Sequence, residues 1–109
     1  MNSEDVKLLE ESQDVIYDLS ELCHKISVQH GFWQSDNFAE KIMLVVTELS
    51  EAVESHRCNG FTKHLAEELA DTVIRILDLC FFYGIDLGGE IANKVIVNEG
   101  RPQKHGKNY

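Results

Sequence analysis

The middle of the chain, residues 48–71, reads ELSEAVESHRCNGFTKHLAEELAD. It begins with one acid-x-x-acid block, Glu48 to Glu51, and ends with a second, Glu68 to Asp71. An Asn-Gly pair, which is typical of a turn, lies between them. Residues three apart on a helix lie on one face, so each block places two carboxylates on one side of a helix. If these two helices pack side by side, four carboxylates converge.

Such a convergence favours a bound cation. Two like charges about 4 Å apart repel by roughly 4 kcal/mol at an effective dielectric constant near 20. An all-oxygen set of ligands suits a hard ion such as Mg²⁺. With 19 acidic residues in the chain, one such pair is expected by chance on a solvated face. Two pairs on successive helices, each beside an apolar stripe, are harder to dismiss.

The sequence argues against a di-iron carboxylate site. That site needs two Glu-x-x-His motifs, and only Glu21 to His24 matches. No other histidine spacing suits a metal, so we expect the histidines on the surface or in loops. They are His24, His30, His56, His64 and His105.

The apolar periodicity predicts an all-α fold, a four-helix bundle formed by a single domain over residues 1–109. The expected helices are 4–29, 37–57, 62–83 and 87–99. The expected N-cap residues are Asn2 or Ser3, Ser35 or Asp36, Thr62, and Asp86. Residues 101–109 show no apolar period and predict an irregular basic tail.

The second and third helices should carry most of the core. The expected buried stripe of the second helix comprises Phe38, Ile42, Val45, Val46, Leu49 and Val53. The third helix is apolar around most of its circumference, which places it at the centre or at a subunit interface. Glu48 should lie at the edge of the core. Asp71 and Arg75 are four residues apart and should form an ion pair.

Charge and composition exclude several kinds of partner. The net charge is −9; residues 94–109 carry +3, so the rest of the chain carries −12. An acidic body argues against binding a nucleic-acid duplex. No apolar run reaches about 18 residues, so no membrane partner is expected. The N-terminal residues do not resemble a signal peptide, and three cysteines without a C-x-x-C motif suit a reduced compartment. We therefore expect a cytoplasmic protein.

Two sequence features together resemble a known family. Glu48-x-x-Glu51, then residues 52–67, then Glu68-x-x-Asp71 is similar to the E-x-x-E…E-x-x-D signature of the MazG group of all-α nucleoside triphosphate pyrophosphohydrolases. Lys94-x-x-x-Asn98-x-x-Arg101 resembles the K-x-x-x-N-x-x-R segment of that family. Residues 101–107 also resemble its R-P-x-x-H-G-K ending. The resemblance covers about residues 33–107.

The resemblance implies an oligomeric MazG-type domain that cleaves a nucleoside triphosphate between its α- and β-phosphates. It implies a Mg²⁺ requirement, with Mn²⁺ as a substitute. It assigns both metal binding and catalysis to Glu48, Glu51, Glu68 and Asp71, and one of these or Glu67 would orient the attacking water. The implied substrate-binding residues are Lys94, Asn98, Arg101, Trp33, Asn37, Lys104 and Lys107. The family forms homodimers or homotetramers with the site near the subunit interface.

Several readings stay open at this level. The base and sugar of the substrate are not defined, since dimeric dUTPases and phosphoribosyl-ATP pyrophosphohydrolases are related enzymes. Removal of non-standard or surplus nucleotides is the role that the family suggests. A different class of function is a non-catalytic acidic module that binds a protein through its apolar third helix. A nucleotide sensor without turnover is a third possibility.

Overall fold

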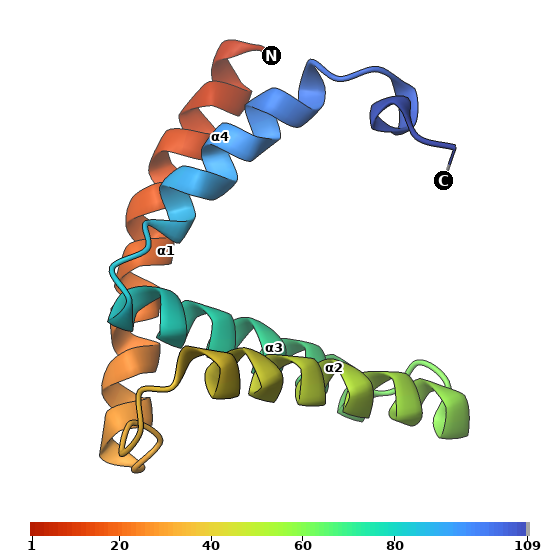
Figure 1. Ribbon diagram of the computed structural model, residues 1–109. Helices are drawn as coiled ribbons and strands as arrows, with labels where there is room; N and C mark the ends of the chain where they lie inside the picture. The colour runs from red at the N-terminus through yellow and green to blue at the C-terminus, as the bar shows by residue number, and fades with distance from the viewer. Residues whose placement is uncertain (109) are drawn as a thin grey trace.

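The computed structural model describes residues 1–108, and within them the fold is entirely helical, with no β-strand (Figure 1). This confirms the all-α class. The four α-helices are α1 (Ser3–Gln29), α2 (Phe38–Asn59), α3 (Lys63–Phe82) and α4 (Leu87–Glu99). A short 3-10 turn, η1 (Gln103–Gly106), forms within the stretch expected to be irregular. Tyr109, the last residue of that expected tail, lies outside the described residues.

Side-chain caps explain where the helices begin. Asn2 and Thr62 accept hydrogen bonds from backbone N–H groups of α1 and α3, and Asp86 accepts one from α4, as predicted. The predicted cap of α2 is wrong: Asn37, and not Ser35 or Asp36, accepts the N–H of Glu40, at 3.1 Å. Asn37 is the last extended residue before the helix, so its side chain is the one within reach of the free N–H groups.

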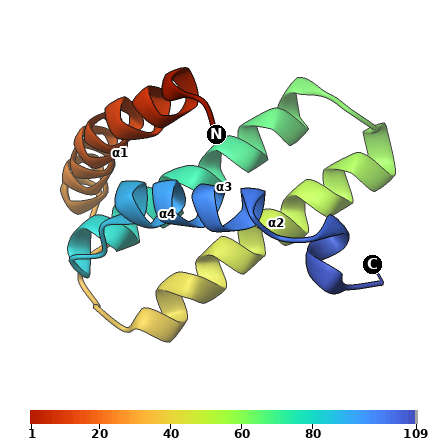
Figure 2. The same cartoon turned by 90° about the horizontal axis from the view of Figure 1, so that it is seen from above.

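The helices form two antiparallel pairs that diverge like the arms of a V (Figures 1 and 2). One arm holds α4 against the first part of α1, and the other holds α2 beside α3. The two arms join where α3 packs against α1. The radius of gyration is 16.4 Å, whereas a compact chain of this length is expected near 13 Å. One chain therefore does not close its helices into a single compact bundle.

A glycine allows the close packing within the first arm. A Cβ atom placed on Gly88, at the start of α4, would lie only 3.0 Å from both the Cα and the carbonyl oxygen of Gln13. Because backbone cannot yield as a flexible side chain can, only glycine fits here without a shift of α4 relative to α1. Gly88 therefore sets how closely these two helices approach.

The core of one chain is small. Val45, Leu79 and Cys80 are buried at its centre, and partly buried side chains from α3, the loop before α2 and the start of α4 pack around them. The predicted stripe of α2 is largely wrong for a single chain, because only Val45 is buried while Val53 is 60% exposed. The other exposed members of that stripe are Phe38, Ile42, Val46 and Leu49. The reason is that α3 covers only one side of α2.

The third helix also presents apolar side chains to solvent. Leu69, Val73 and Ile74 are all about half exposed. Contiguous apolar surface of this kind is typical of a protein interaction site. Among residues 1–108, no helix combines the length and apolar character that crossing a bilayer requires.

Candidate metal centre

The structure brings together three of the four acids that the sequence singled out. Glu48 comes from α2, and Glu68 and Asp71 come from adjacent turns of α3. Each offers a carboxylate oxygen, and these oxygens all lie within 4.8 Å of one another. The turn at residues 60–62 makes the two helices antiparallel, so the first acid block faces the second.

The fourth acid lies at the rim of this cluster. Glu51 is exposed on α2, one turn beyond Glu48. It is close enough to contribute, after Glu48 and burial, to raising the pKa of Glu68. Glu67, the alternative residue for orienting water, is also exposed.

The pKa shifts of Glu48 and Glu68 show that the cluster disfavours ionisation of both carboxyl groups at once. The pKa of Glu68 is raised, chiefly by the neighbouring Glu48 carboxyl group and next by burial. Burial also acts to raise the pKa of Glu48, but the hydrogen bond from Arg75 and the neighbouring Glu68 carboxyl group outweigh it and leave that pKa lowered. The two groups therefore compete: the one that holds a cationic partner ionises at the expense of the other.

Glu68 supplies an independent sign that the cluster suits a cation. The residue is only 8% exposed. Its Oε1 atom lies 3.2 Å from Nε2 of the exposed His64. Its Oε2 atom is buried and has no hydrogen-bond partner among the described residues. A buried carboxylate oxygen without a partner is costly, and a divalent cation shared with Glu48 and Asp71 would satisfy it. The residues present therefore fit a hard divalent metal.

Arg75 pairs across the helix interface and not along its own helix. Within the described residues its Nε atom donates to Oε1 of Glu48 at 2.9 Å, so the predicted ion pair with Asp71 is wrong. Its guanidinium carbon also lies 5.5 Å from the centre of the Phe32 ring. The rotation of α3 against α2 directs this side chain toward Glu48 even though Asp71 is one turn away on the same helix.

A cavity of about 220 Å³ opens beside the carboxylates, between the end of α1 and α3. Its lining includes Glu48, Asp71, Arg75 and Asp78, together with Phe32. A larger cavity, about 480 Å³, lies between α1 and the junction of α3 with α4. None of the predicted site residues lines the larger cavity, so the smaller one is the space next to the candidate metal ligands.

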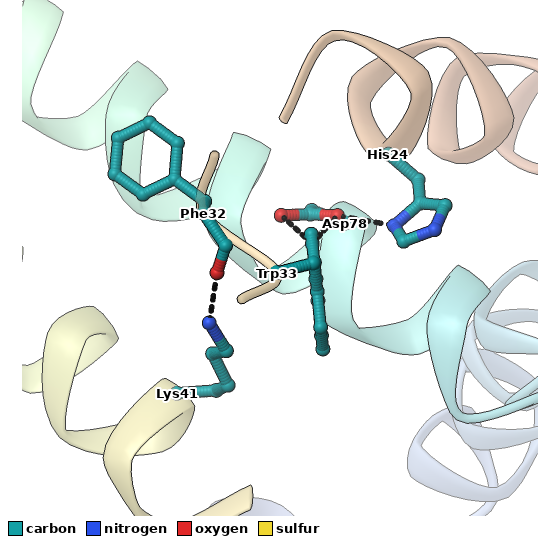
Figure 3. A network of polar contacts seen from close by, with 5 residues as sticks. All are labelled: His24, Phe32, Trp33, Lys41 and Asp78. Carbon is teal, nitrogen blue, oxygen red and sulfur yellow. Dashed lines mark hydrogen bonds and ion pairs between the residues drawn. The ribbon is translucent and has the colours of Figure 1, made fainter. Parts of the chain in front are cut away.

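Asp78 organises one wall of that space (Figure 3). Both of its carboxylate oxygens accept hydrogen bonds from Nε1 of Trp33, at 2.9 and 3.1 Å. Nδ1 of His24 lies 2.8 Å from the same carboxylate. A carboxylate can only accept, so the proton lies on Nδ1 of His24. The side chain of His24 is 16% exposed, so its expected surface position is wrong. The feature of the sequence that could have indicated this network is Asp78, an acid within the largely apolar third helix.

The indole ring of Trp33 has neighbours on both faces. The ring of Phe82 stacks on it with 4.0 Å between the centres. The ammonium group of Lys41 lies 4.5 Å from the indole centre, and because the stacked ring fills one face, it covers the other. Lys41 also donates to the carbonyl oxygen of Phe32 (Figure 3). A nucleobase could stack on this indole only after Lys41 or Phe82 moved.

The remaining predicted substrate-binding residues lie elsewhere in the chain. Lys94 and Asn98 belong to α4, and Arg101 follows it, on the arm of the V opposite α2 and α3 (Figure 1). None of the three lines the 220 Å³ cavity. Lys104 and Lys107 are exposed in the C-terminal segment. One chain therefore does not bring its basic segment to its carboxylates.

Comparisons with known proteins do not add to this picture. No family model matches the chain, and neither a search of curated proteins nor a search of solved structures found a match.

Proposed function

We propose that the protein is a Mg²⁺-dependent nucleotide pyrophosphohydrolase. It would cleave a nucleoside or deoxynucleoside triphosphate between the α- and β-phosphates, giving the monophosphate and pyrophosphate. The observation that carries the proposal is the buried, unpartnered Oε2 atom of Glu68 beside the carboxylates of Glu48 and Asp71. The family resemblance of the two acid blocks and the basic segment supports the same reaction.

The three clustered residues all supply carboxylate oxygens, which a hard metal prefers. Glu48, Glu68 and Asp71 would hold the ion, and Glu51 lies at the rim. When bound, Mg²⁺ supplies neutralising charge for the polyphosphate and makes a bound water more acidic. Cysteine thiolates, which softer metals prefer, are absent from this cluster.

An acid at the rim of the cluster would orient and deprotonate the attacking water. In the proposed reaction a water molecule attacks the α-phosphorus. The bond from that phosphorus to the α–β bridging oxygen breaks, and pyrophosphate leaves with this oxygen. We propose that Glu51, which is exposed beside the cluster, accepts the proton of that water. Arrangement of water and phosphate by fixed carboxylates is the main contribution that a protein makes to such a reaction.

A second copy of the chain would complete the site. The 220 Å³ cavity is smaller than the roughly 300–1,000 Å³ typical of pockets for small molecules. The basic segment of one chain lies away from its own acids, and the apolar faces of α2 and α3 are exposed. We propose a homodimer or homotetramer in which Lys94, Asn98 and Arg101 of one copy approach the carboxylates of another.

The broad proposal is tested by assaying pyrophosphate release from each common NTP and dNTP with Mg²⁺. We expect turnover that EDTA abolishes and that Glu51→Ala and Asp71→Ala each remove. Both variants should keep the wild-type oligomer mass in sedimentation analysis. Absence of turnover with every nucleotide, from folded protein, would refute the enzyme proposal. Full activity in both variants would refute the site.

Shared assembly of the site has its own test. A Glu51→Ala chain and a Lys94→Ala chain, each inactive alone, should regain activity when unfolded and refolded together. Recovery is expected because a mixed oligomer contains one site with both wild-type contributions. If activity does not return although mixed oligomers form, the acids and Lys94 do not act across an interface.

The exposed apolar faces of α2 and α3 also support a non-catalytic module that binds a protein partner. A nucleotide sensor would use the same carboxylate cluster without turnover. Melting curves with and without Mg²⁺ and a nonhydrolysable nucleotide separate these candidates, because a ligand that binds the folded state raises the melting temperature. An enzyme or sensor should gain stability from the two together. A protein-binding module should not.

A further inference from the structure

We infer that Arg75 is a resident cation at Glu48, which a divalent metal displaces, and that the displaced guanidinium then binds the polyphosphate in the adjacent cavity. The inference rests on the proposed function, since it assumes that the carboxylate cluster binds metal. It adds a substrate-binding residue that links metal binding to substrate binding.

The geometry places Arg75 in competition with a metal. Its Nε atom lies 2.9 Å from Oε1 of Glu48. The carboxylate of Glu48 is at the same time part of the cluster whose oxygens lie within 4.8 Å of one another. Among the described residues, Arg75 is the only Lys or Arg paired with Glu48, Glu68 or Asp71. A metal that binds the Glu48 carboxylate must therefore compete with the guanidinium of Arg75, which is already bonded to that carboxylate.

Arg75 satisfies this cluster only in part. Its hydrogen bond is to Glu48, whereas Oε2 of Glu68 is buried and has no partner within the part of the chain that the structure describes. A compact divalent ion carries twice the charge of a guanidinium and can contact several carboxylates at once. Exchange of Arg75 for the ion would satisfy the oxygen that Arg75 leaves without a partner.

The displaced side chain has a place to go. Arg75 lines the 220 Å³ cavity together with Asp71 and Asp78, and its guanidinium lies 5.5 Å from the Phe32 ring centre. A metal at Glu48 would repel the guanidinium, while phosphate oxygens in the cavity would attract it. The planar guanidinium can bind two phosphate oxygens at once, which lysine cannot do.

Removal of the arginine charge therefore has opposite effects on the two ligands. We expect Arg75→Gln to bind Mn²⁺ more tightly than wild type in the absence of nucleotide, by about threefold to tenfold, because a competing charge-assisted hydrogen bond is gone. The same variant should have a raised KM for the nucleotide. A purely structural role would weaken both, so the opposite signs identify the exchange.

The experiment titrates Mn²⁺ into nucleotide-free protein and reads free Mn²⁺ by electron paramagnetic resonance. Arg57→Gln is the matched control, because Arg57 pairs with Glu54 on the exposed side of α2 at 3.7 Å, outside the cluster. It changes the net charge equally and should leave the Mn²⁺ affinity within twofold of wild type. Arg75→Lys keeps the charge and should also stay close to wild type for Mn²⁺. If Arg75→Gln does not fold, Arg75→Met replaces it.

The outcomes are distinct. Wild-type protein that binds no Mn²⁺ overturns the metal site and this inference with it. Wild-type binding without tighter binding in Arg75→Gln overturns the inference alone. Tighter binding with an unchanged KM overturns the phosphate role of Arg75. Tighter binding with a raised KM, and neither change in Arg57→Gln, supports the whole inference.

Discussion

Replacement of Asp78 by alanine should destabilise the junction between the two arms. Asp78 is the acceptor for two donors, Nε1 of Trp33 and Nδ1 of His24. Loss of an acceptor leaves a buried donor without a partner, at about 1–3 kcal/mol each. The side chains of Asp78 and His24 are 13% and 16% exposed, so some water can enter. We therefore expect a loss near the lower half of the summed range, about 2–4 kcal/mol.

The assay is thermal unfolding followed by circular dichroism, in EDTA and at one fixed protein concentration. A loss of this size should lower the melting temperature by roughly 10–20 °C in a chain of about 100 residues. Asp18→Ala is the matched control, because Asp18 is an exposed acid on α1. Exposed substitutions of this kind usually change stability by less than about 0.5 kcal/mol. If Asp78→Ala melts within a few degrees of Asp18→Ala, the network does not stabilise the junction as argued.

Three further predictions test other features. Folding raises the pKa of Glu68, so the metal-free protein should lose stability as the pH rises through that pKa. In EDTA, Glu68→Gln should therefore melt at a higher temperature than wild type at pH 7 and at the same temperature at acid pH. A lower melting temperature of the variant at pH 7 would contradict this. Gly88→Ala should cost about 1–3 kcal/mol in denaturant unfolding, since its Cβ would meet the Gln13 backbone, whereas Gly100→Ala, with 3.6 Å of room, serves as control. Ser55→Ala should stabilise by about 0.5–2 kcal/mol because the buried Ser55 Oγ has no partner, and the exposed Ser50→Ala should gain less.

The helices and the meeting of the acid blocks followed from local rules. Apolar periods and capping side chains near residues 2, 62 and 86 act over a few residues, so the sequence alone locates the helices well. The spacing within each acid block and the turn between them bring Glu48 to Glu68 and Asp71 without further information.

What the sequence did not reveal depends on helix rotation and on contacts between distant residues. Spacing along one helix pointed Arg75 at Asp71, but the rotation of α3 against α2 directs it to Glu48, 27 positions away. His24 and Asp78 are 54 residues apart, and no local pattern joins them. A periodic apolar stripe also shows which face needs cover without showing whether the same chain covers it, which is why most of the α2 stripe was expected to be buried.

The position of Trp33 gives the protein a built-in optical reporter. It is the only tryptophan in the chain. Its indole joins the loop before α2 to α3 through Asp78, and Phe82 and Lys41 enclose its two faces. Any movement of Lys41 or of the hydrogen bond to Asp78 changes the polarity around the indole. The wavelength of its fluorescence emission should therefore change when a ligand or a second copy of the chain alters the packing at the junction of the two arms, and no added label is needed.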